Sequence, residues 1–194
     1  MGICVVGVGG AGNNIVSSLA EDLPENNICF LVDTDPYALI SLADGPARII
    51  MKSKHFYQSA RSVAKRVVKK LKDNGLQDHD VILCGGVGGS TGGGLMPEIA
   101  RTLARSGNHV KVLAVKPYPF EVVSRINRGA KAFEKLDKYD IRHDVLDASE
   151  ELDDEEVRRM SIEGFLDHVD DMAILSIKSD INDKFVSDDM DVNL

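Results

Sequence analysis

The fold is decided by residues 3–14, which read ICVVGVGGAGNN. An apolar run is followed at once by a glycine-rich turn and then by helical spacing, which predicts a buried strand, a tight turn and a helix. Glycines let the backbone approach a ligand closely, and the unpaired N–H groups at a helix start favour a phosphate. We therefore predict a phosphate contact at Gly9, Gly10, Ala11, Gly12, Asn13 and Asn14, with helix capping as the alternative role of the two asparagines.

The same turn also satisfies the dinucleotide-binding pattern G-x-G-x-x-G, at Gly7, Gly9 and Gly12. Asp33 follows the next apolar run, residues 28–32, at the place where dinucleotide-binding folds position the acid that holds a ribose. By itself, this half of the sequence predicts an NAD(P)-binding domain.

A second glycine-rich segment, residues 85–94 (GGVGGSTGGG), follows another apolar run. So many glycines are costly in ordered structure unless bare backbone amides must wrap a ligand, which predicts a second phosphate cradle. Two cradles on one phosphate chain indicate a mononucleotide with two or three phosphates, and neither cradle is a Walker A motif. Gly92→Arg is expected to abolish binding with a modest change in stability. The predicted contacts are Gly88, Gly89, Ser90, Thr91, Gly92 and Gly93.

Short apolar runs alternate with helical spacing along the chain, which predicts an α/β, Rossmann-like fold. We expect a mostly parallel sheet with helices on both faces, in a single domain over residues 1–194. Residues 144–156 are expected to form an acidic surface connection. The predicted strands are 3–8, 28–32, 47–51, 81–84, 110–115 and 172–177, and the predicted helices are 14–21, 35–43, 59–73, 95–106, 124–139 and 155–167.

Composition narrows the functional class. Hydrophobic residues are 43% and charged residues 28% of the chain, as in globular proteins, and no apolar run has the length of a membrane helix. Cys4, Cys29 and Cys84 lie far apart in apolar runs, which predicts reduced thiols and a cytoplasmic location. Residues 140–194 contain 18 acidic and 5 basic residues, and we expect the acidic end to be mobile. The basic stretch 59–73 is interpreted as a solvated helix face, without nucleic-acid binding.

Four segments in order resemble the tubulin and FtsZ GTPases. GVGGAGNN at 7–14 and GGSTGGG at 88–94 look like the two phosphate loops of that family, and VDTD at 32–35 resembles its short Asn-Thr-Asp segment. KPYPFE at 116–121, followed by Arg125, resembles a stretch of FtsZ that lies near the nucleotide. The resemblance extends from Gly2 to about residue 133. It implies that Glu121 contacts the ribose, that Pro117, Arg125 and Asp33 lie near the nucleotide, and that Asp180 accepts hydrogen bonds from guanine.

Other positions depart from the family pattern. Ser90 and Gly93 replace the usual glycine and hydroxyl residue, but both keep their backbone donors. The family's third phosphate loop should fall within about residues 50–60, where MKSKHFYQ at 51–58 has no glycine. We expect that the family's second domain and its catalytic acidic loop are absent, and that 188–193 is a solvated acidic tail. At most, slow GTP hydrolysis is therefore expected, without head-to-tail filaments of the type that the family forms.

Three functional hypotheses stay open at this point. The first is an FtsZ-like protein that binds GTP or GDP, with Mg²⁺ held mainly through the phosphates. It would act in cell division or cytoskeletal assembly, together with a full-length homologue or with copies of itself. The second is an NAD(P)-binding Rossmann oxidoreductase, and the third is a degenerate structural partner without nucleotide. A melting shift with GDP but not with NAD⁺ would separate them.

Overall fold

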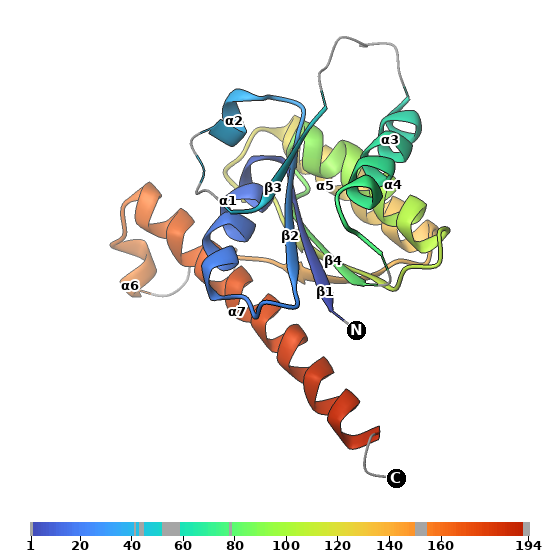
Figure 1. Ribbon diagram of the computed structural model, residues 1–194. Coiled ribbons are helices and arrows are strands. Elements are labelled where there is room, and N and C mark those ends of the chain that lie inside the picture. Colours follow the sequence, from blue (N-terminus) through green and yellow to red (C-terminus); the bar gives the residue numbers. More distant parts are fainter. Residues whose placement is uncertain are drawn as a thin grey trace.

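One parallel sheet organises the structure, a computed structural model that describes residues 2–40, 42, 45–51, 59–77, 79–149 and 155–191. Its strand order is β3-β2-β1-β4-β5-β6 (Figure 1). All strand pairs are parallel, so every carboxyl end lies at the same edge of the sheet. The strands are β1 (Ile3–Val8), β2 (Ile28–Asp33), β3 (Ala47–Ile50), β4 (Asp80–Gly86), β5 (Val110–Val115) and β6 (Arg142–Leu146).

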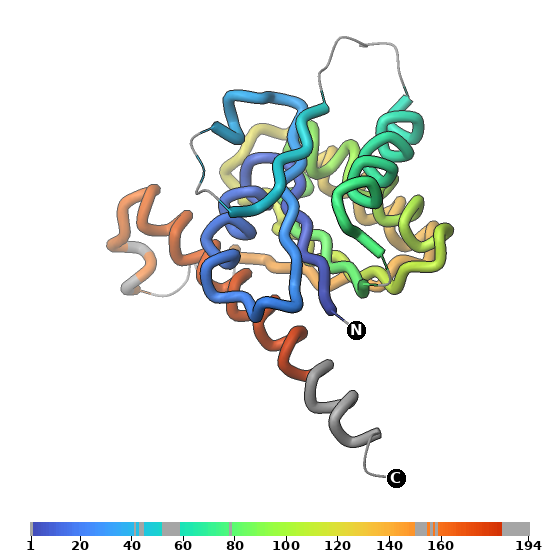
Figure 2. Tube along the Cα trace, in the orientation of Figure 1, coloured from blue at the N-terminus to red at the C-terminus, as the bar shows by residue number. Residues whose placement is uncertain are grey.

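Helices cover both faces of this sheet, as the sequence predicts (Figures 1 and 2). One face packs against α3 (Ala60–Asp73), α4 (Ser90–Ala104) and α5 (Val123–Lys138). The other face packs against α1 (Gly9–Leu19) and α7 (Ile162–Asp191). The remaining short elements are η1 (Ala20–Asp22), α2 (Tyr37–Ile40) and α6 (Glu155–Arg158). Within the described part of the chain, no helix has both the length and the apolar character to cross a membrane.

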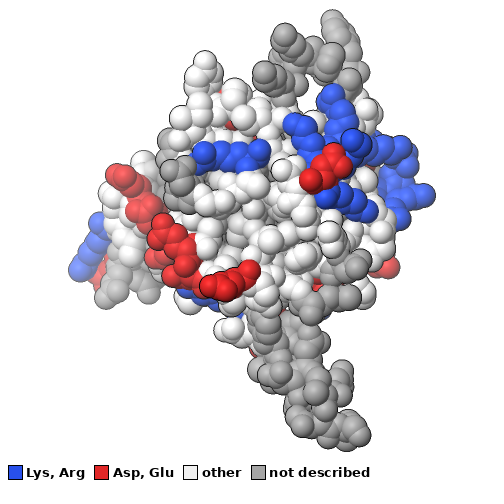
Figure 3. Space-filling model, in the orientation of Figure 1, with Lys and Arg blue, Asp and Glu red and all other residues white. Residues whose placement is uncertain are grey.

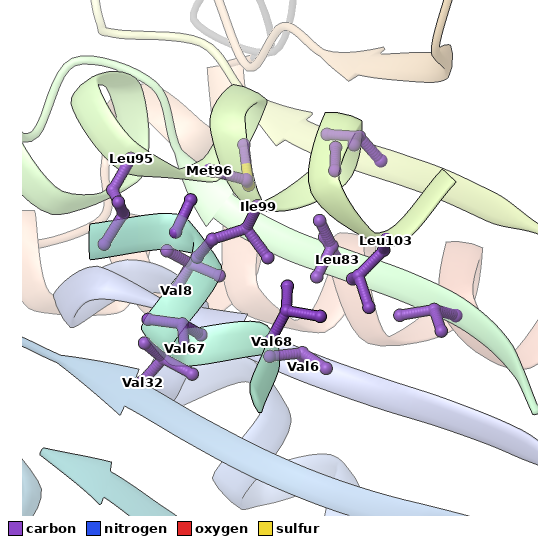
Figure 4. Close-up of a cluster of buried hydrophobic side chains, with 14 of the residues drawn as sticks. Val6, Val8, Val32, Val67, Val68, Leu83, Leu95, Met96, Ile99 and Leu103 are labelled. Atoms are coloured by element: carbon purple, nitrogen blue, oxygen red, sulfur yellow. The ribbon is translucent and has the colours of Figure 1, made fainter. Parts of the chain in front are cut away.

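The core on the α3–α4 side is built from branched aliphatic side chains (Figure 4). Val6 and Leu83 of the central strands are fully buried against this layer. Val67 of α3 and Ile99 of α4 pack onto them from above, also without exposure. β1 is buried at every position, as expected for a central strand covered on both faces. This rigid centre fixes where the carboxyl ends of β1 and β4 lie.

The structure corrects one predicted strand and adds a strand that the sequence analysis did not predict. The predicted strand 172–177 is instead part of α7, because Ala173 and Ile177 pack inward one helical turn apart while Leu175 points to solvent with 67% exposure. The sixth strand is β6, within residues that the sequence assigns partly to an acidic surface connection. β6 is a polar edge strand (RHDVL), so its sequence lacks the apolar run typical of a buried parallel strand.

Both helices that follow the glycine-rich segments begin earlier in the chain than the sequence predicts. α1 begins at Gly9 rather than at residue 14, and α4 begins at Ser90 rather than at residue 95. Gly9, Gly10, Gly12 and the glycines at 92–94 therefore belong to the first turns of two helices, whereas Gly85 and Gly86 end β4. The strand order places these helix starts at the point where the order reverses, between β1 and β4. Open α/β sheets bind ligands outside their carboxyl edge at this point.

Candidate functional site

A pocket of about 550 Å³ opens at the carboxyl ends of β1, β2, β4 and β5. Its walls come from the two glycine-rich segments, from the residues that follow β2 and β5, and from the start of α7. The pocket therefore lies at the switch point of the sheet, where two helix N-termini converge.

The first glycine segment leaves open space on its pocket side. Gly9 has a φ of +77°, and a Cβ there would lie 3.1 Å from the amide nitrogen of Gly92. This contact shows that the two segments touch each other. Gly10 lines the pocket and is exposed, and a Cβ built on it would meet nothing within 4 Å. The first turn of α1 thus offers unpaired N–H groups with free space beside them.

The second glycine segment is packed against its own backbone. A Cβ on Gly92 would lie 2.2 Å from the carbonyl oxygen of Gly86, and one on Gly93 would lie 1.9 Å from the carbonyl oxygen of Val87. These overlaps are with backbone atoms that cannot move aside. The expectation that Gly92→Arg changes stability only modestly is therefore wrong, because the substitution would disrupt the turn itself.

A buried carboxylate ties the two segments together. Asp33, only 5% exposed, accepts hydrogen bonds from the backbone N–H groups of Thr34 (2.6 Å) and Asp35 (3.1 Å). It also accepts from the Thr91 hydroxyl (3.4 Å) and from the side-chain amide of Asn13 (3.2 Å). Thr91 belongs to the second segment and Asn13 to the first, so Asp33 links both to the end of β2.

Asn13 has a structural role that the sequence did not identify. Its side chain is fully buried and forms hydrogen bonds with the backbone carbonyl and N–H of Val32, at 3.2 and 3.1 Å. No side-chain hydrogen bond caps the start of α1. Asn13 therefore braces α1 against β2 from beneath the pocket, while Asn14 lines the pocket.

The third wall follows β5. The Glu121 carboxylate accepts from Arg125 at 2.5 Å and from the backbone N–H of Tyr118 at 3.3 Å. Lys116 forms an ion pair with Asp147, and the hydrogen bond between them lowers the pKa of the Asp147 carboxyl. Both basic side chains of the pocket, Lys116 and Arg125, are thus already paired with carboxylates of the protein itself.

The fourth wall is the start of α7, which the sequence did not connect with the site. Leu166 and Asp170 lie one helical turn apart and both line the pocket, while Phe165 and Val169 on the adjoining helix face are buried in the core. Burial, together with the neighbouring carboxylates of Asp167 and Asp171, raises the pKa of Asp170 from 3.8 to about 6. The sequence signal for this wall is the spacing of four residues between Leu166 and Asp170. It places both side chains on one face only if the segment is a helix.

Most of the predicted site residues come together here, with some exceptions. Gly12, Asn13 and Gly93 do not line the pocket but lie under it, where a Cβ on Gly12 would be 2.1 Å from the Cys84 carbonyl oxygen. Of the expected third phosphate loop, residues 52–58 lie outside the described residues. The predicted residues that line the pocket are Gly9, Gly10, Ala11, Asn14, Asp33, Gly88, Gly89, Ser90, Thr91, Gly92, Pro117, Glu121 and Arg125.

The predicted guanine contact of Asp180 is not supported by its position. Its carboxylate accepts a hydrogen bond from Lys111 at 2.6 Å, near the amino end of β5. It lines a separate pocket of about 530 Å³ together with Ile3 and Asp80, which start β1 and β4. This pocket lies at the opposite edge of the sheet from the main pocket. The prediction for Asp180 assumed that it follows a strand over 172–177, whereas these residues belong to the helix α7.

The charge of the main pocket is negative. Its described lining includes the carboxylates of Asp33, Asp35, Glu121 and Asp170, against the two paired cations of the third wall. Phosphate binding would therefore depend on backbone amides and hydroxyls rather than on free basic side chains.

Comparison with known proteins gives a family match over most of the chain. The model of the "Tubulin/FtsZ family, GTPase domain" matches residues 2–142. The cell division protein FtsZ of Aquifex aeolicus is 31% identical over an aligned length of 143 residues, and the match covers 69% of this chain and 38% of that protein. FtsZ of Wolbachia sp. is 30% identical over 156 residues, covering 71% of this chain and 39% of that protein. The chain thus spans about two fifths of the length of these curated relatives.

Solved structures show the same fold. An empty FtsZ dimer from M. jannaschii superimposes with a TM-score of 0.79 at 23% identity, covering 92% of this chain and 54% of that chain. The GTPγS-bound protofilament of CetZ2 from Haloferax volcanii gives a TM-score of 0.75 at 16% identity, covering 91% of this chain and 57% of that one. The family model matches residues 2–142, and the order of the two glycine segments and of the strands agrees with this match. The chain therefore belongs to the tubulin/FtsZ family.

Proposed function

We propose that the chain binds GTP or GDP in the pocket at the carboxyl edge of the sheet. The observation that carries this proposal is the contact between the two glycine-rich helix starts, where a Cβ on Gly9 would lie 3.1 Å from the Gly92 nitrogen. Two sets of unpaired backbone amides face one pocket, and each lies at the positive end of a helix dipole. Such an arrangement suits one chain of phosphates better than the single pyrophosphate of a dinucleotide.

Guanine selectivity is assigned to Asp170 in place of Asp180. A carboxylate can accept two hydrogen bonds from the N–H groups on the edge of guanine, whereas adenine offers no matching pair of donors. Asp170 lines the pocket from α7, and Leu166 beside it offers an apolar surface for the base. The Glu121–Arg125 pair, on the wall that follows β5, remains the proposed contact for the ribose and its surroundings.

Mg²⁺ fits the donor set near the end of β2. The carboxylates of Asp33 and Asp35 and the hydroxyls of Thr34 and Thr91 are the hard oxygen ligands that this ion prefers, and the two hydroxyl oxygens lie 3.1 Å apart. When bound with the nucleotide, the ion would neutralise phosphate charge in a pocket that already carries several carboxylates. Asp33 would then bind the Mg²⁺ ion that neutralises the phosphates. Its hydrogen bond from Thr91 would keep that side chain in place.

Hydrolysis is proposed to be slow at most. Hydrolysis of the terminal phosphate needs a group that positions or activates water. The carboxylates of the described pocket lining are all assigned other roles: Asp33 and Asp35 to Mg²⁺, Glu121 to the ribose and Asp170 to guanine. A role in cell division or cytoskeletal assembly, alongside a longer homologue or further copies of the chain, follows from the family. The three cysteines are free thiols, which supports a reducing, cytoplasmic location.

Thermal unfolding with GDP, ADP and NAD⁺ tests the proposal. A ligand at about 100 times its dissociation constant stabilises the folded state by about 2.7 kcal/mol, which is readily measured. GDP should raise the melting temperature, whereas ADP and NAD⁺ should leave it nearly unchanged. A shift with NAD⁺ alone would instead support a dinucleotide-binding oxidoreductase, and no shift with any nucleotide would support a structural partner.

Phosphate release from GTP by the purified chain tests the hydrolysis proposal separately. We expect a rate far below that of a polymerising FtsZ. Brisk turnover would contradict it, without affecting the assignment of the binding pocket.

A further inference from the structure

The exposed side of α3 is a basic surface, which we name the α3 face. The helix has the sequence ARSVAKRVVKKLKD, with six basic residues and a single acidic one. Its apolar residues are buried under the basic ones, and Figure 3 shows the resulting blue cluster. The exposed basic residues are Arg61, Lys65, Arg66, Lys69, Lys70 and Lys72.

Most of this charge is not neutralised within the chain. Lys69 pairs with Asp73 at 3.3 Å, and Lys70 donates a hydrogen bond to the Ile50 carbonyl oxygen at 3.2 Å. Within the described ranges, no acidic side chain forms an ion pair with the other four basic residues of the α3 face.

The charges also work against the helix that carries them. Arg61 and Lys65, like Lys65 and Lys69, are four residues apart, a spacing at which like charges destabilise a helix. The first turn contains no acidic residue, and Arg61 there opposes the helix dipole. Only the last turn gains locally, because Lys70 and Lys72 suit the negative end of the dipole and Lys69 pairs with Asp73. The charges of the first turns gain nothing from local structure, which points to an anionic surface outside the chain.

The molecule presents a matching acidic surface on the opposite side of its sheet, which we name the acidic strip. It runs along the first turns of α7 and across η1 and the connection that follows, and it is visible in red in Figure 3. Lys178 of α7 pairs with Asp22 of η1 at 2.7 Å, which holds η1 against α7 about two helical turns after Asp171 and neutralises the Asp22 carboxylate. The exposed acidic residues are Glu21, Asp22, Glu25, Glu163, Asp167 and Asp171.

We propose that the α3 face docks onto the acidic strip of a second copy of this chain. The basic residues from Arg61 to Lys72 extend over about 17 Å of helix, and those from Glu163 to Asp171 over about 12 Å, before η1 lengthens the strip. The two surfaces lie on opposite faces of the sheet, so each copy keeps one of each free for a further copy. The contact is head to tail between sheet faces and does not require nucleotide.

The composition of α3 favours protein over nucleic acid as the partner. The helix contains no aromatic residue that could stack on bases, and its charges are spread over two adjacent stripes rather than grouped around a cleft. An acidic strip of similar length on the same molecule supplies a complementary partner at the same concentration.

Sedimentation velocity of the nucleotide-free protein, at low and high salt, tests the proposal. We expect association at low salt that is lost at high salt. Lys65→Gln/Lys72→Gln on the α3 face and Glu21→Gln/Glu163→Gln on the acidic strip should each weaken association about tenfold or more. The control Lys131→Gln/Lys138→Gln removes the same charge from the exposed side of α5 and should associate like the native chain.

A mixture of the two face variants distinguishes this contact from unspecific attraction. Each variant keeps one intact surface, so the mixture should form one-to-one complexes that do not grow further. A native chain that stays monomeric at low salt, or an α5 control as weak as the α3 variant, would overturn the proposal. A third result would also overturn it. If the α3 variant still self-associates like the native chain but no longer binds duplex DNA or phosphatidylserine vesicles, the α3 face binds that partner instead.

Discussion

Asp170→Asn is expected to stabilise the empty protein and to weaken its binding of guanine nucleotide. The two effects have one cause, the cost of keeping a carboxylate charged in a partly buried site beside Asp167 and Asp171. The rise of its pKa from 3.8 to about 6 corresponds to at most about 3 kcal/mol. We expect about 1 kcal/mol, because the side chain remains partly exposed to solvent, which screens its charge.

The pH dependence of this gain follows from the sign of the shift. Because the pKa is higher in the folded protein than in the unfolded chain, the contribution of Asp170 to stability is fully present below pH 3.8 and is lost as the pH rises through about 6. The difference in unfolding free energy between Asp170→Asn and the native protein should therefore be near its full value above pH 6. It should shrink toward zero as the pH falls to about 4.

The loss of binding follows from the hydrogen bonds that the carboxylate would make. Hydrogen bonds to charged groups contribute about 1.5–3 kcal/mol, so GDP affinity should fall about 10- to 100-fold. Urea unfolding across pH and calorimetric titration with GDP measure the two effects on the same samples. In the native protein, affinity for GDP should also decline as the pH falls below about 6, where Asp170 becomes protonated.

One result would refute this reasoning directly. If Asp170→Asn binds GDP as tightly as the native protein, Asp170 does not contact the base. If the variant is instead less stable than the native protein at neutral pH, the carboxylate is held by stabilising contacts, and its raised pKa has been misread.

Four further substitutions, one of them a control, probe the phosphate side of the pocket. Gly10→Glu should stabilise the empty protein by about 0.5–1 kcal/mol, because glycine is unfavourable in a helix and an acid suits its first turn, yet abolish the GDP-induced melting shift. Gly94→Ala, a similar helix glycine with nothing within 4 Å of its Cβ and outside the pocket lining, should gain stability and keep the shift. Gly93→Ala should lower the free energy of unfolding by about 2–3 kcal/mol in urea titrations, since its Cβ overlaps the Val87 carbonyl; an unchanged midpoint would contradict the packing. Asp33→Asn removes a negative charge near the phosphates, so it should bind GDP more tightly than the native protein in EDTA but not in excess Mg²⁺. A fluorescent GDP analogue measures both affinities. Equal Mg²⁺ dependence of the two proteins would exclude a charge effect of Asp33.

Local sequence was enough for the framework of the site. At residues 3–14, and again after residue 81, an apolar run is followed by glycines and then by helical spacing. This pattern has few structural solutions, because a buried strand must leave the sheet through a turn in which its backbone groups find hydrogen-bond partners. The α/β class and the two glycine-rich turns between strand and helix could therefore be predicted. Asp33 was predicted from the dinucleotide pattern, and Glu121 and Arg125 from the resemblance to FtsZ; all three line the pocket.

The far wall of the pocket was decided only by tertiary structure. The run MAILSI at 172–177 has the apolar character of a strand, and only packing of Ala173 and Ile177 against α1 and the sheet makes it a helix. That choice brings Asp170 to the pocket and carries Asp180 to the opposite edge of the sheet, where it pairs with Lys111. The sixth strand likewise depends on pairing with β5, since a polar edge strand has no apolar run of its own. Sequence determined which segments could hold phosphate, whereas long-range packing determined which carboxylate of α7 lines the pocket.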